Sequence, residues 1–570
     1  MININVGVLG HVDSGKTNLC KALSTIASTA AFDKNPESKR RGITIDLGFS
    51  SFDVENIPKS RVDLAEKYKN ILFTLVDCPG HASLIKTIIC GAQIIDMILL
   101  VIDINKGIQT QTAECIVIGQ MTCKNLIVVI NKIDLVPEKE REGKINQVTK
   151  ILKNALKKTK FTKISYVGVS ANVGATQMEI TPRSINAEKL IELMVESIED
   201  PTELRNMESK KPFLFAVDHC FTINGKGTIL TGTVIQGTLS VDDNIELPLF
   251  MIQKKVLSMQ MFRKPIKTIT PGFRAGICIP QIDSKLMERG LICQPKTLVP
   301  VHACIIGNVE RVSFFKGKIA SKKLFHVSVG QDTLTCKITV FHSKVKTNQI
   351  NVIEDFPKEL YYDDELPSDE NRLPDAEYFI LIHFDHPVCC SKDGLLIGFK
   401  LDADINSKLC RIAFNGKVIL GLSNPKYHEQ DLTKLPIFKT KLRIGKIDRV
   451  SNARDLIVRG LFKKDTNWSL FDNLKVTLVC IKSDCMSEGI ERLDAENIIW
   501  SIDGVIIGNF GQTGKCRVTL SQDLPDEIVK RYSGKGKNEP SNVSKLIDHR
   551  LELVLKFKRY IFNKTHRFVQ

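Results

Sequence analysis

The order of apolar and polar residues divides the chain into parts with different periodicities. Over residues 1 to about 205, short apolar runs alternate with segments of helical pattern, beginning with the alternation Ile2, Ile4, Val6 and Val8. Strands that alternate with helices are typical of a parallel sheet covered by helices on both faces. We therefore expect residues 1–207 to form an α/β domain.

Strand patterns dominate from Lys211-Pro212 onward. Phe213, Phe215 and Val217 occupy alternate positions, and turn glycines between 225 and 237 separate the next short strands. Such spacing indicates antiparallel barrels. We expect one barrel over residues 208–300 and a second over 301–434, where apolar residues alternate on both sides of a hairpin turn at 330–333.

Two further segments have their own composition. Residues 354–377 are acidic, contain proline and show no periodicity, which predicts a mobile surface insertion in the second barrel. Past residue 435, short strand patterns recur at 446–450, 474–480, 505–507, 515–520 and 551–557. We expect residues 435–570 to form a small β-rich C-terminal domain.

Charge and composition limit the kind of protein. The 570 residues carry a formal charge of +16, and residues 431–570 hold 26 Lys and Arg against 17 Asp and Glu. This basic C-terminal part favours a polyanion partner such as RNA. No apolar run is long enough to span a membrane, and the scattered cysteines fit buried reduced thiols. We expect a soluble monomer in the cytoplasm, with a nuclear fraction left open.

The first strand leads into a phosphate-loop motif. Residues 10–17 read Gly-x-x-x-x-Gly-Lys-Thr, with a helical pattern after them. In such a loop the backbone N–H groups of Asp13, Ser14 and Gly15 surround nucleotide phosphates, Lys16 reaches the terminal phosphates, and Thr17 can ligate Mg²⁺. The sequence therefore predicts an α/β P-loop nucleotide-binding domain at the N-terminus.

Three further motifs follow at the ends of predicted strands: Asp77-Cys-Pro-Gly80, Asn131-Lys132-Ile-Asp134 and Ser170-Ala171. Asp77 is expected to hold Mg²⁺ through water, and the Gly80 N–H to sense the γ-phosphate. A carboxylate at Asp134 can accept two hydrogen bonds from the guanine edge, which adenine cannot supply. The predicted ligand is GTP or its product GDP, not ATP.

Two residues between and after these motifs fit roles in hydrolysis. Thr44, in the basic loop after the first helix, can complete the Mg²⁺ shell only while the γ-phosphate is present. His81 follows Gly80 directly, where a histidine can position the attacking water. We predict Thr44 as a switch residue and His81 as the catalytic residue.

Together, Gly-His-Val-Asp-Ser-Gly-Lys-Thr (10–17), Arg-Gly-Ile-Thr (41–44), Asp-Cys-Pro-Gly-His (77–81) and Asn-Lys-Ile-Asp (131–134) resemble the translational GTPases related to elongation factor Tu. Residues 27–34 and 41–49 resemble more narrowly the eukaryotic selenocysteine-specific elongation factors, the counterparts of bacterial SelB. The resemblance implies an α/β P-loop GTPase domain, two Tu-like β-barrels that hold the aminoacyl end and the arms of tRNA, and a C-terminal domain.

The resemblance also implies two groups of site residues. Asp218, His219 and Arg274 match a pocket for the selenocysteinyl group, in which Arg274 and protonated His219 would face an ionised selenol and Asp218 the ammonium group. Val12 and Ile43 match a hydrophobic gate in front of His81. In bacterial SelB, several winged-helix modules bind the RNA hairpin that signals recoding. About 140 β-rich residues after position 435 cannot encode these modules, so a separate protein is expected to bind the RNA hairpin.

The sequence therefore predicts a GTPase that delivers selenocysteinyl-tRNA to the ribosome at recoded UGA codons. Two alternatives stay open. One is another tRNA-carrying translational GTPase, of the initiation or rescue kind. The other is an RNA-binding scaffold that holds GTP without hydrolysing it, against which the presence of Thr44, Asp77 and His81 argues.

Overall fold

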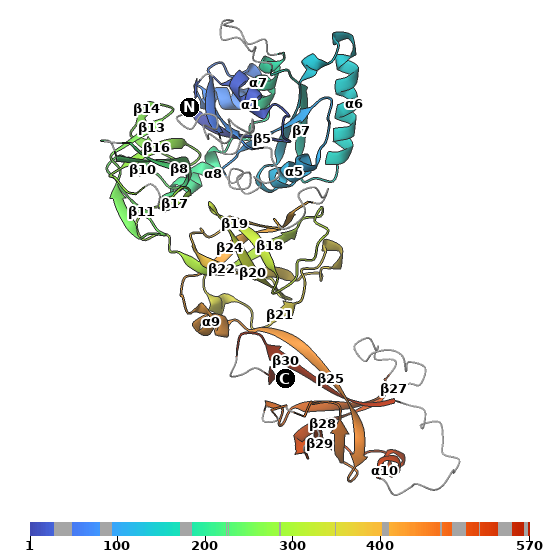
Figure 1. The fold of residues 1–570 in the computed structure, drawn as a ribbon. Coiled ribbons are helices and arrows are strands. Elements are labelled where there is room, and N and C mark those ends of the chain that lie inside the picture. The colour runs from blue at the N-terminus through green and yellow to red at the C-terminus, as the bar shows by residue number, and fades with distance from the viewer. Residues whose placement is uncertain are drawn as a thin grey trace. The chain divides into compact units, whose positions relative to one another are not determined.

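The computed structural model divides into two compact units (Figure 1). The first contains Met1–Val340, Asp364–Pro374 and Tyr378–Pro425, and the second contains Phe341–Asp363, Asp375–Glu377 and Lys426–Gln570. The structure describes residues 1–24, 26–27, 48–79, 94–171, 185–223, 225, 227–283, 287–347, 349–401, 410–464, 466–467, 470–481, 498–511, 514–533, 550–563 and 568–570. Among the helices in these ranges, none is long and apolar enough to cross a membrane.

The first unit begins with a seven-stranded sheet in the order β2-β3-β4-β1-β5-β6-β7. Its strands are β1 (Ile2–Gly10), β2 (Ile26–Ala27), β3 (Gly48–Val54), β4 (Ile71–Asp77), β5 (Met97–Asp103), β6 (Asn125–Asn131) and β7 (Lys163–Gly168). Strands β4, β1, β5, β6 and β7 are parallel, whereas β3 runs antiparallel to β4. The predicted α/β domain is therefore confirmed.

Helices cover this sheet (Figure 1). They are α1 (Lys16–Leu23), α3 (Val62–Lys67), α5 (Thr110–Thr122), α6 (Glu138–Leu156) and α7 (Ala187–Glu196), with short 3₁₀ turns at Lys59–Arg61 and Ile133–Leu135. The helix that follows, α8 (Thr202–Ser209), contacts the barrel that comes next in the chain. Apolar residues of α1 and α7 share one core with β1, β4 and β5. All nine residues of β1 are buried, as a central strand between two helical layers requires.

The next part of the first unit is antiparallel. An eight-stranded sheet has the order β12-β11-β17-β8-β9-β16-β13-β14, and β10 pairs with β15. The strands are β8 (Leu214–Ile223), β9 (Gly227–Gln236), β10 (Leu239–Ser240), β11 (Asn244–Leu247), β12 (Ile252–Lys255), β13 (Ser258–Met261), β14 (Lys264–Ile266), β15 (Thr268–Ile269), β16 (Arg274–Ile279) and β17 (Gly290–Cys293). The expected alternation is confirmed, since Phe213, Phe215 and Val217 all lie in the core of this barrel.

The second barrel is closed by hydrogen bonds. Six strands run in the order β19-β23-β24-β18-β22-β20, and β19 pairs again with β20. They are β18 (Val301–Arg311), β19 (Leu324–Val329), β20 (Asp332–Ser343), β22 (Glu377–Val388), β23 (Leu395–Phe399) and β24 (Ile412–Leu422). The predicted hairpin is confirmed: β19 and β20 flank a turn in which Gly330 has φ +55°.

The second unit contains the C-terminal barrel, whose strands follow the order β25-β26-β29-β28-β27-β30 and close because β25 also pairs with β30. The elements are α9 (Tyr427–Gln430), β25 (Ile437–Val450), β26 (Asp455–Arg459), β27 (Lys475–Ile481), β28 (Ile498–Phe510), β29 (Lys515–Leu520), α10 (Asp526–Tyr532), β30 (Arg550–Tyr560) and β31 (Phe568–Val569). All five strand patterns expected past residue 435 lie on these strands. The C-terminal domain is β-rich, as predicted.

The acidic segment 354–377 differs from its prediction. It contains β21 (Leu360–Asp363), which pairs in parallel with β25, and short 3₁₀ turns at Ile353–Asp355 and Asp369–Asn371. Leu360 and Leu366 are fully buried. The expectation of a mobile surface insertion is therefore wrong for Leu360–Asp363, because a four-residue strand is too short to produce a periodic signal and its partner strand is paired 77 positions further along the chain, Leu360 with Ile437.

A buried ion pair joins the sheet domain to the second barrel within the first unit. The Nε and Nη2 atoms of Arg411 donate to Oε1 and Oε2 of Glu114 on α5, both over 2.8 Å. The two side chains are only 5% and 8% exposed. An exposed pair, Lys160 with Glu310, joins the same two parts over 2.6 Å.

Glu114→Leu is expected to lower the free energy of unfolding by about 3–5 kcal/mol, because Arg411 would remain buried without its carboxylate. Lys160→Ala, as the exposed control, is expected to cost less than about 1 kcal/mol. Urea denaturation of the full chain, followed by circular dichroism, measures both. Adding Arg411→Met to Glu114→Leu is expected to recover most of the loss. A double variant no more stable than Glu114→Leu alone would contradict the ion-pair explanation.

Candidate functional site

The phosphate-loop motif forms the turn between β1 and α1. Gly10 has φ +150°, and a Cβ there would lie 2.3 Å from the Val101 carbonyl oxygen. Gly15 has φ +90°, and a Cβ there would lie 2.3 Å from the Asn131 amide nitrogen. Both positions therefore require glycine. The loop leads directly into the N-terminus of α1, and the backbone N–H groups of a first helical turn favour anions.

The two side chains after Gly15 have the positions that a nucleotide site needs. The Lys16 ammonium donates to the His11 carbonyl over 2.7 Å and is almost fully buried. Burial lowers the pKa of Lys16, and the nearby Asp77 carboxylate acts in the opposite direction. The Thr17 hydroxyl donates to Oδ2 of Asp77 over 2.6 Å. A hydroxyl and a carboxylate side by side are hard oxygen donors, which fit Mg²⁺.

The predicted base-reading residues form one network. The Asn131 amide donates to the Ser14 carbonyl over 2.9 Å, and its oxygen accepts from the Ala171 N–H over 3.2 Å. Asn131 thus ties the phosphate loop to the segment after β7. The Ser170 hydroxyl donates to Oδ1 of Asp134 over 2.6 Å, which orients this carboxylate.

The sequence reasoning missed one member of this network. Asp103, at the end of β5, forms an ion pair with Lys132 over 2.9 Å. Burial would raise the pKa of Asp103, but hydrogen bonds from Lys132 and the Asn105 N–H outweigh it and lower the pKa. One feature of the sequence could have indicated Asp103: it ends an apolar strand, as Asn131 does. In the structure the two residues are register partners. Asp103 holds Lys132, which has φ +65°.

The structure does not reach every predicted residue of this site. Ile43, Thr44, Gly80 and His81 lie outside the described residues. Val12 and Asp13 are described: both lie in the turn after β1, Val12 half-buried and Asp13 exposed with φ +60°. The roles of these residues in the gate, the switch and hydrolysis stay predictions.

The second group of predicted residues comes together in the first barrel. Arg274, at the start of β16, donates through Nη1 to Oδ2 of Asp218 and through Nη2 to Oδ1 over 3.0 Å. The Nδ1 atom of His219 lies 2.8 Å from the same Oδ1 atom. Thr231 on β9, which the sequence reasoning missed, donates to it over 2.9 Å. Thus Asp218 binds three neighbours.

The charges of this group depend on burial and pairing. Asp218 and Arg274 are both about 95% buried. Burial would raise the pKa of Asp218, but the charge of Arg274 and the hydrogen bonds from His219 and Arg274 lower it to about 2. Asp218 is therefore ionised at neutral pH and balances the charge of Arg274. A net positive charge would come from protonation of His219.

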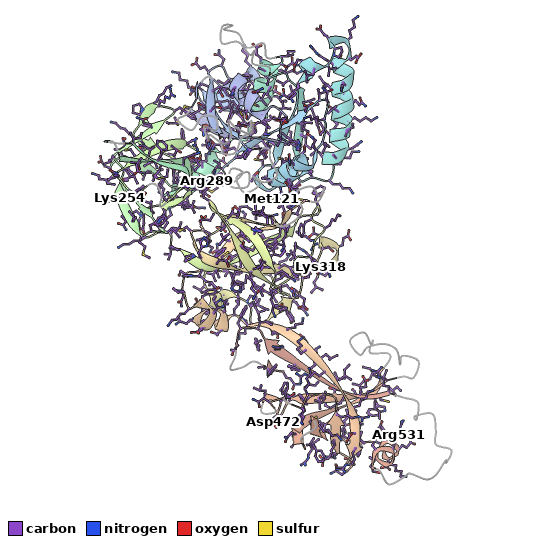
Figure 2. The ribbon with its side chains drawn as sticks, in the orientation of Figure 1. Met121, Lys254, Arg289, Lys318, Asp472 and Arg531 are labelled. Carbon is purple, nitrogen blue, oxygen red and sulfur yellow. The ribbon has the colours of Figure 1, made fainter. Side chains whose placement is uncertain are left out.

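A cavity of about 340 Å³ opens beside this group. Arg274 and Thr231 contribute to its wall, and most of the other lining is apolar, with Phe221, Ile229 and Phe262 among it. An apolar cavity with one buried cation can hold a ring system and an anionic or polar group together. A hollow of about 300 Å³ lies beside Glu288 and Arg289, the latter labelled in Figure 2.

Three protein-family models match the chain. The model "Elongation factor Tu GTP binding domain" matches residues 2–200. The model "Selenocysteine-specific elongation factor, eukaryotes, 3rd domain" matches residues 306–416. The model "eEFSec C-terminal RIFT domain" matches residues 433–489.

Individual proteins give the same result. The chain is 40% identical to the selenocysteine-specific elongation factor of Mus musculus, covering 100% of this chain and 99% of the relative. It is 35% identical to that of Methanocaldococcus jannaschii over 61% of this chain and 67% of the relative. The crystal structure of translation elongation factor SelB from Methanococcus maripaludis, in complex with the GTP analogue GppNHp, is similar with a TM-score of 0.65 and 25% identity, covering 98% of this chain and 99% of that one.

Proposed function

Since the chain belongs to the selenocysteine-specific elongation factors, a family of translational GTPases, we propose that it binds selenocysteinyl-tRNA in a GTP-dependent complex. It would deliver this tRNA to the ribosome at recoded UGA codons, and GTP hydrolysis would trigger release. The observation that carries the proposal is the buried Asp218–Arg274 pair, with the half-buried His219 bonded to it, beside a mostly apolar cavity in the first barrel.

The residues of the nucleotide site fit the GTP and Mg²⁺ that this function needs. The loop after β1 and Lys16 would hold the phosphates, Thr17 and Asp77 would hold Mg²⁺, and Asp134 would accept hydrogen bonds from guanine. Bound Mg²⁺ neutralises charge on the phosphates during hydrolysis. Lys16 is buried, so little water would screen its ammonium group from the phosphates.

The pocket group fits the chemistry of a selenocysteinyl side chain. A selenol is ionised near neutral pH, whereas the hydroxyl of the seryl precursor is neutral. Arg274, held by Asp218, and a protonated His219 would stabilise a desolvated anion much more than a neutral hydroxyl. The cavity beside them would hold the aminoacyl end of the tRNA.

Arg274→Ala is expected to reduce the preference for selenocysteinyl-tRNA over the seryl form about tenfold or more, because a charge-assisted hydrogen bond is lost. Protection of the aminoacyl ester bond against hydrolysis, measured with GTP, reports this preference. Arg263→Ala is the matched control, since Arg263 lines the same cavity outside the pocket group. It is expected to change the protection of both forms equally.

The same measurement separates the alternatives. Equal protection of ordinary aminoacyl-tRNAs would make the protein a general carrier or an initiation or rescue factor. Protection of none would favour the RNA-binding scaffold. We further propose a monomer in the cytoplasm whose basic C-terminal barrel contacts the ribosome or a separate protein bound to the RNA hairpin.

A further inference from the structure

The pocket arginine contacts a residue from outside its own barrel. Phe49, on β3 of the α/β domain, is 1% exposed, and its ring centroid lies 3.2 Å from Cζ of Arg274. The same ring meets His219 edge-on, with centroids 6.5 Å apart and an interplanar angle of 84°. Phe49 thus contacts both Arg274 and His219 of the pocket group.

These contacts restrict the guanidinium group of Arg274. Asp218 binds its edge through two hydrogen bonds, and the ring of Phe49 lies against it. An aromatic face carries negative charge density that attracts a cation, most strongly where water is absent. Asp218 and Phe49 together therefore fix the orientation of a long side chain that would otherwise have many rotamers.

The backbone before Arg274 is held by the α/β domain as well. The carbonyl of Gly272 accepts hydrogen bonds from the side-chain amides of Asn3 over 2.6 Å and Asn5 over 2.9 Å, both on β1. Gly272 has φ +85°, and a Cβ there would lie 2.2 Å from Cζ of Arg205. The turn that leads into β16 is thus fixed to the strand that carries the phosphate loop.

The position of Phe49 relates this contact to the nucleotide site. Strand β3 pairs with β4 so that Gly48 is the partner of Asp77 and Phe49 the partner of Val76. Phe49 therefore directly follows Gly48, the register partner of Asp77, and the carboxylate of Asp77 accepts a hydrogen bond from Thr17. One strand of the α/β domain connects the predicted Mg²⁺ carboxylate with the pocket arginine.

From these contacts we propose that Phe49 is a positioning residue that determines selectivity for the selenocysteinyl group. Its ring holds Arg274 in the orientation that faces the anion, so that the pocket is complete only with a residue of the nucleotide-binding domain. This inference rests on the proposed function and adds a second domain to the selective site.

The test measures ester-bond protection of selenocysteinyl-tRNA and of the seryl form, with GTP and the full chain. Phe49→Leu is expected to reduce the ratio of the two about tenfold, with the protection of the seryl form and the affinity for GTP unchanged. Replacing Phe49 by 3,4,5-trifluorophenylalanine, which keeps the shape of the ring but weakens its negative face, is expected to reduce the ratio in the same direction.

Phe52→Leu is the matched control. Phe52 is a buried phenylalanine on the same strand, but it stacks on Phe73 with centroids 5.0 Å apart. Phe52→Leu is expected to leave the ratio of selenocysteinyl to seryl protection unchanged. A ratio that Phe49→Leu leaves intact, or that Phe52→Leu reduces equally, overturns the role of Phe49 while the delivery function stands. A wild-type protein without any preference overturns both.

Discussion

Asp134→Asn is expected to reduce the affinity for GTP by about 10⁴-fold, because a site built to accept two hydrogen bonds rejects a partner that cannot make them. The Asp134 carboxylate is oriented by the Ser170 hydroxyl over 2.6 Å. An amide in its place offers one acceptor and one donor, and the donor would face the N–H groups of guanine. Equilibrium binding of a fluorescent GTP analogue measures the loss.

The chemistry of the base provides the control for this variant. Xanthine carries a carbonyl where guanine carries its exocyclic amine, so the side-chain amide of the variant could donate to it. Asp134→Asn is therefore expected to bind xanthosine triphosphate better than GTP, whereas the wild-type protein prefers GTP. Ser170→Ala, which removes only the orienting bond, is expected to weaken GTP binding about tenfold. Equal affinity of Asp134→Asn for both nucleotides would exclude Asp134 as the base reader.

His81→Ala is expected to reduce ribosome-stimulated GTP hydrolysis by about 10²–10⁴-fold, the usual contribution of a group that positions or activates the attacking water. His81 follows the end of β4 by four residues, and Asp77 at that end is bound to Thr17 over 2.6 Å. The predicted catalytic residue therefore follows closely on the predicted Mg²⁺ carboxylate. Single-turnover release of phosphate, with programmed ribosomes present, measures the loss.

Binding experiments separate the catalytic role of His81 from a structural one. If His81 only positions water, His81→Ala keeps the affinity for GTP and the protection of selenocysteinyl-tRNA. A variant that hydrolyses GTP at the wild-type rate would remove His81 from catalysis. A variant that loses nucleotide binding together with hydrolysis would instead indicate a folding role.

The sequence predicted well those features whose residues are neighbours in the chain. The phosphate loop, the segment Asn131–Asp134 and the pair Ser170-Ala171 all lie at strand ends, where the structure connects them through Asn131. The alternation of Phe213, Phe215 and Val217 predicted a barrel strand. Local patterns suffice here because strand periodicity and glycine turns depend on the backbone of a few consecutive residues.

Partners that are distant in the chain could not be predicted in this way. The ion pair of Glu114 with Arg411 joins residues 297 positions apart, and β21 pairs with β25 through Leu360, a buried leucine in an acidic segment. A single sequence contains no signal for such pairs. Each partner, judged from its own type and its neighbours in the chain, resembles an ordinary surface or loop residue. The resemblance to a family named Asp218, His219 and Arg274, but not Thr231 or Phe49.

The sequence by itself thus determined the class of protein, the nucleotide and the order of the domains. Only the tertiary structure decided how the proposed selective pocket is built. There, Asp218 balances the charge of Arg274, and Phe49 of another domain holds the same guanidinium group. The physical reason is that how strongly a charged group interacts depends on its burial and on its neighbours. Both are set by how distant segments pack together.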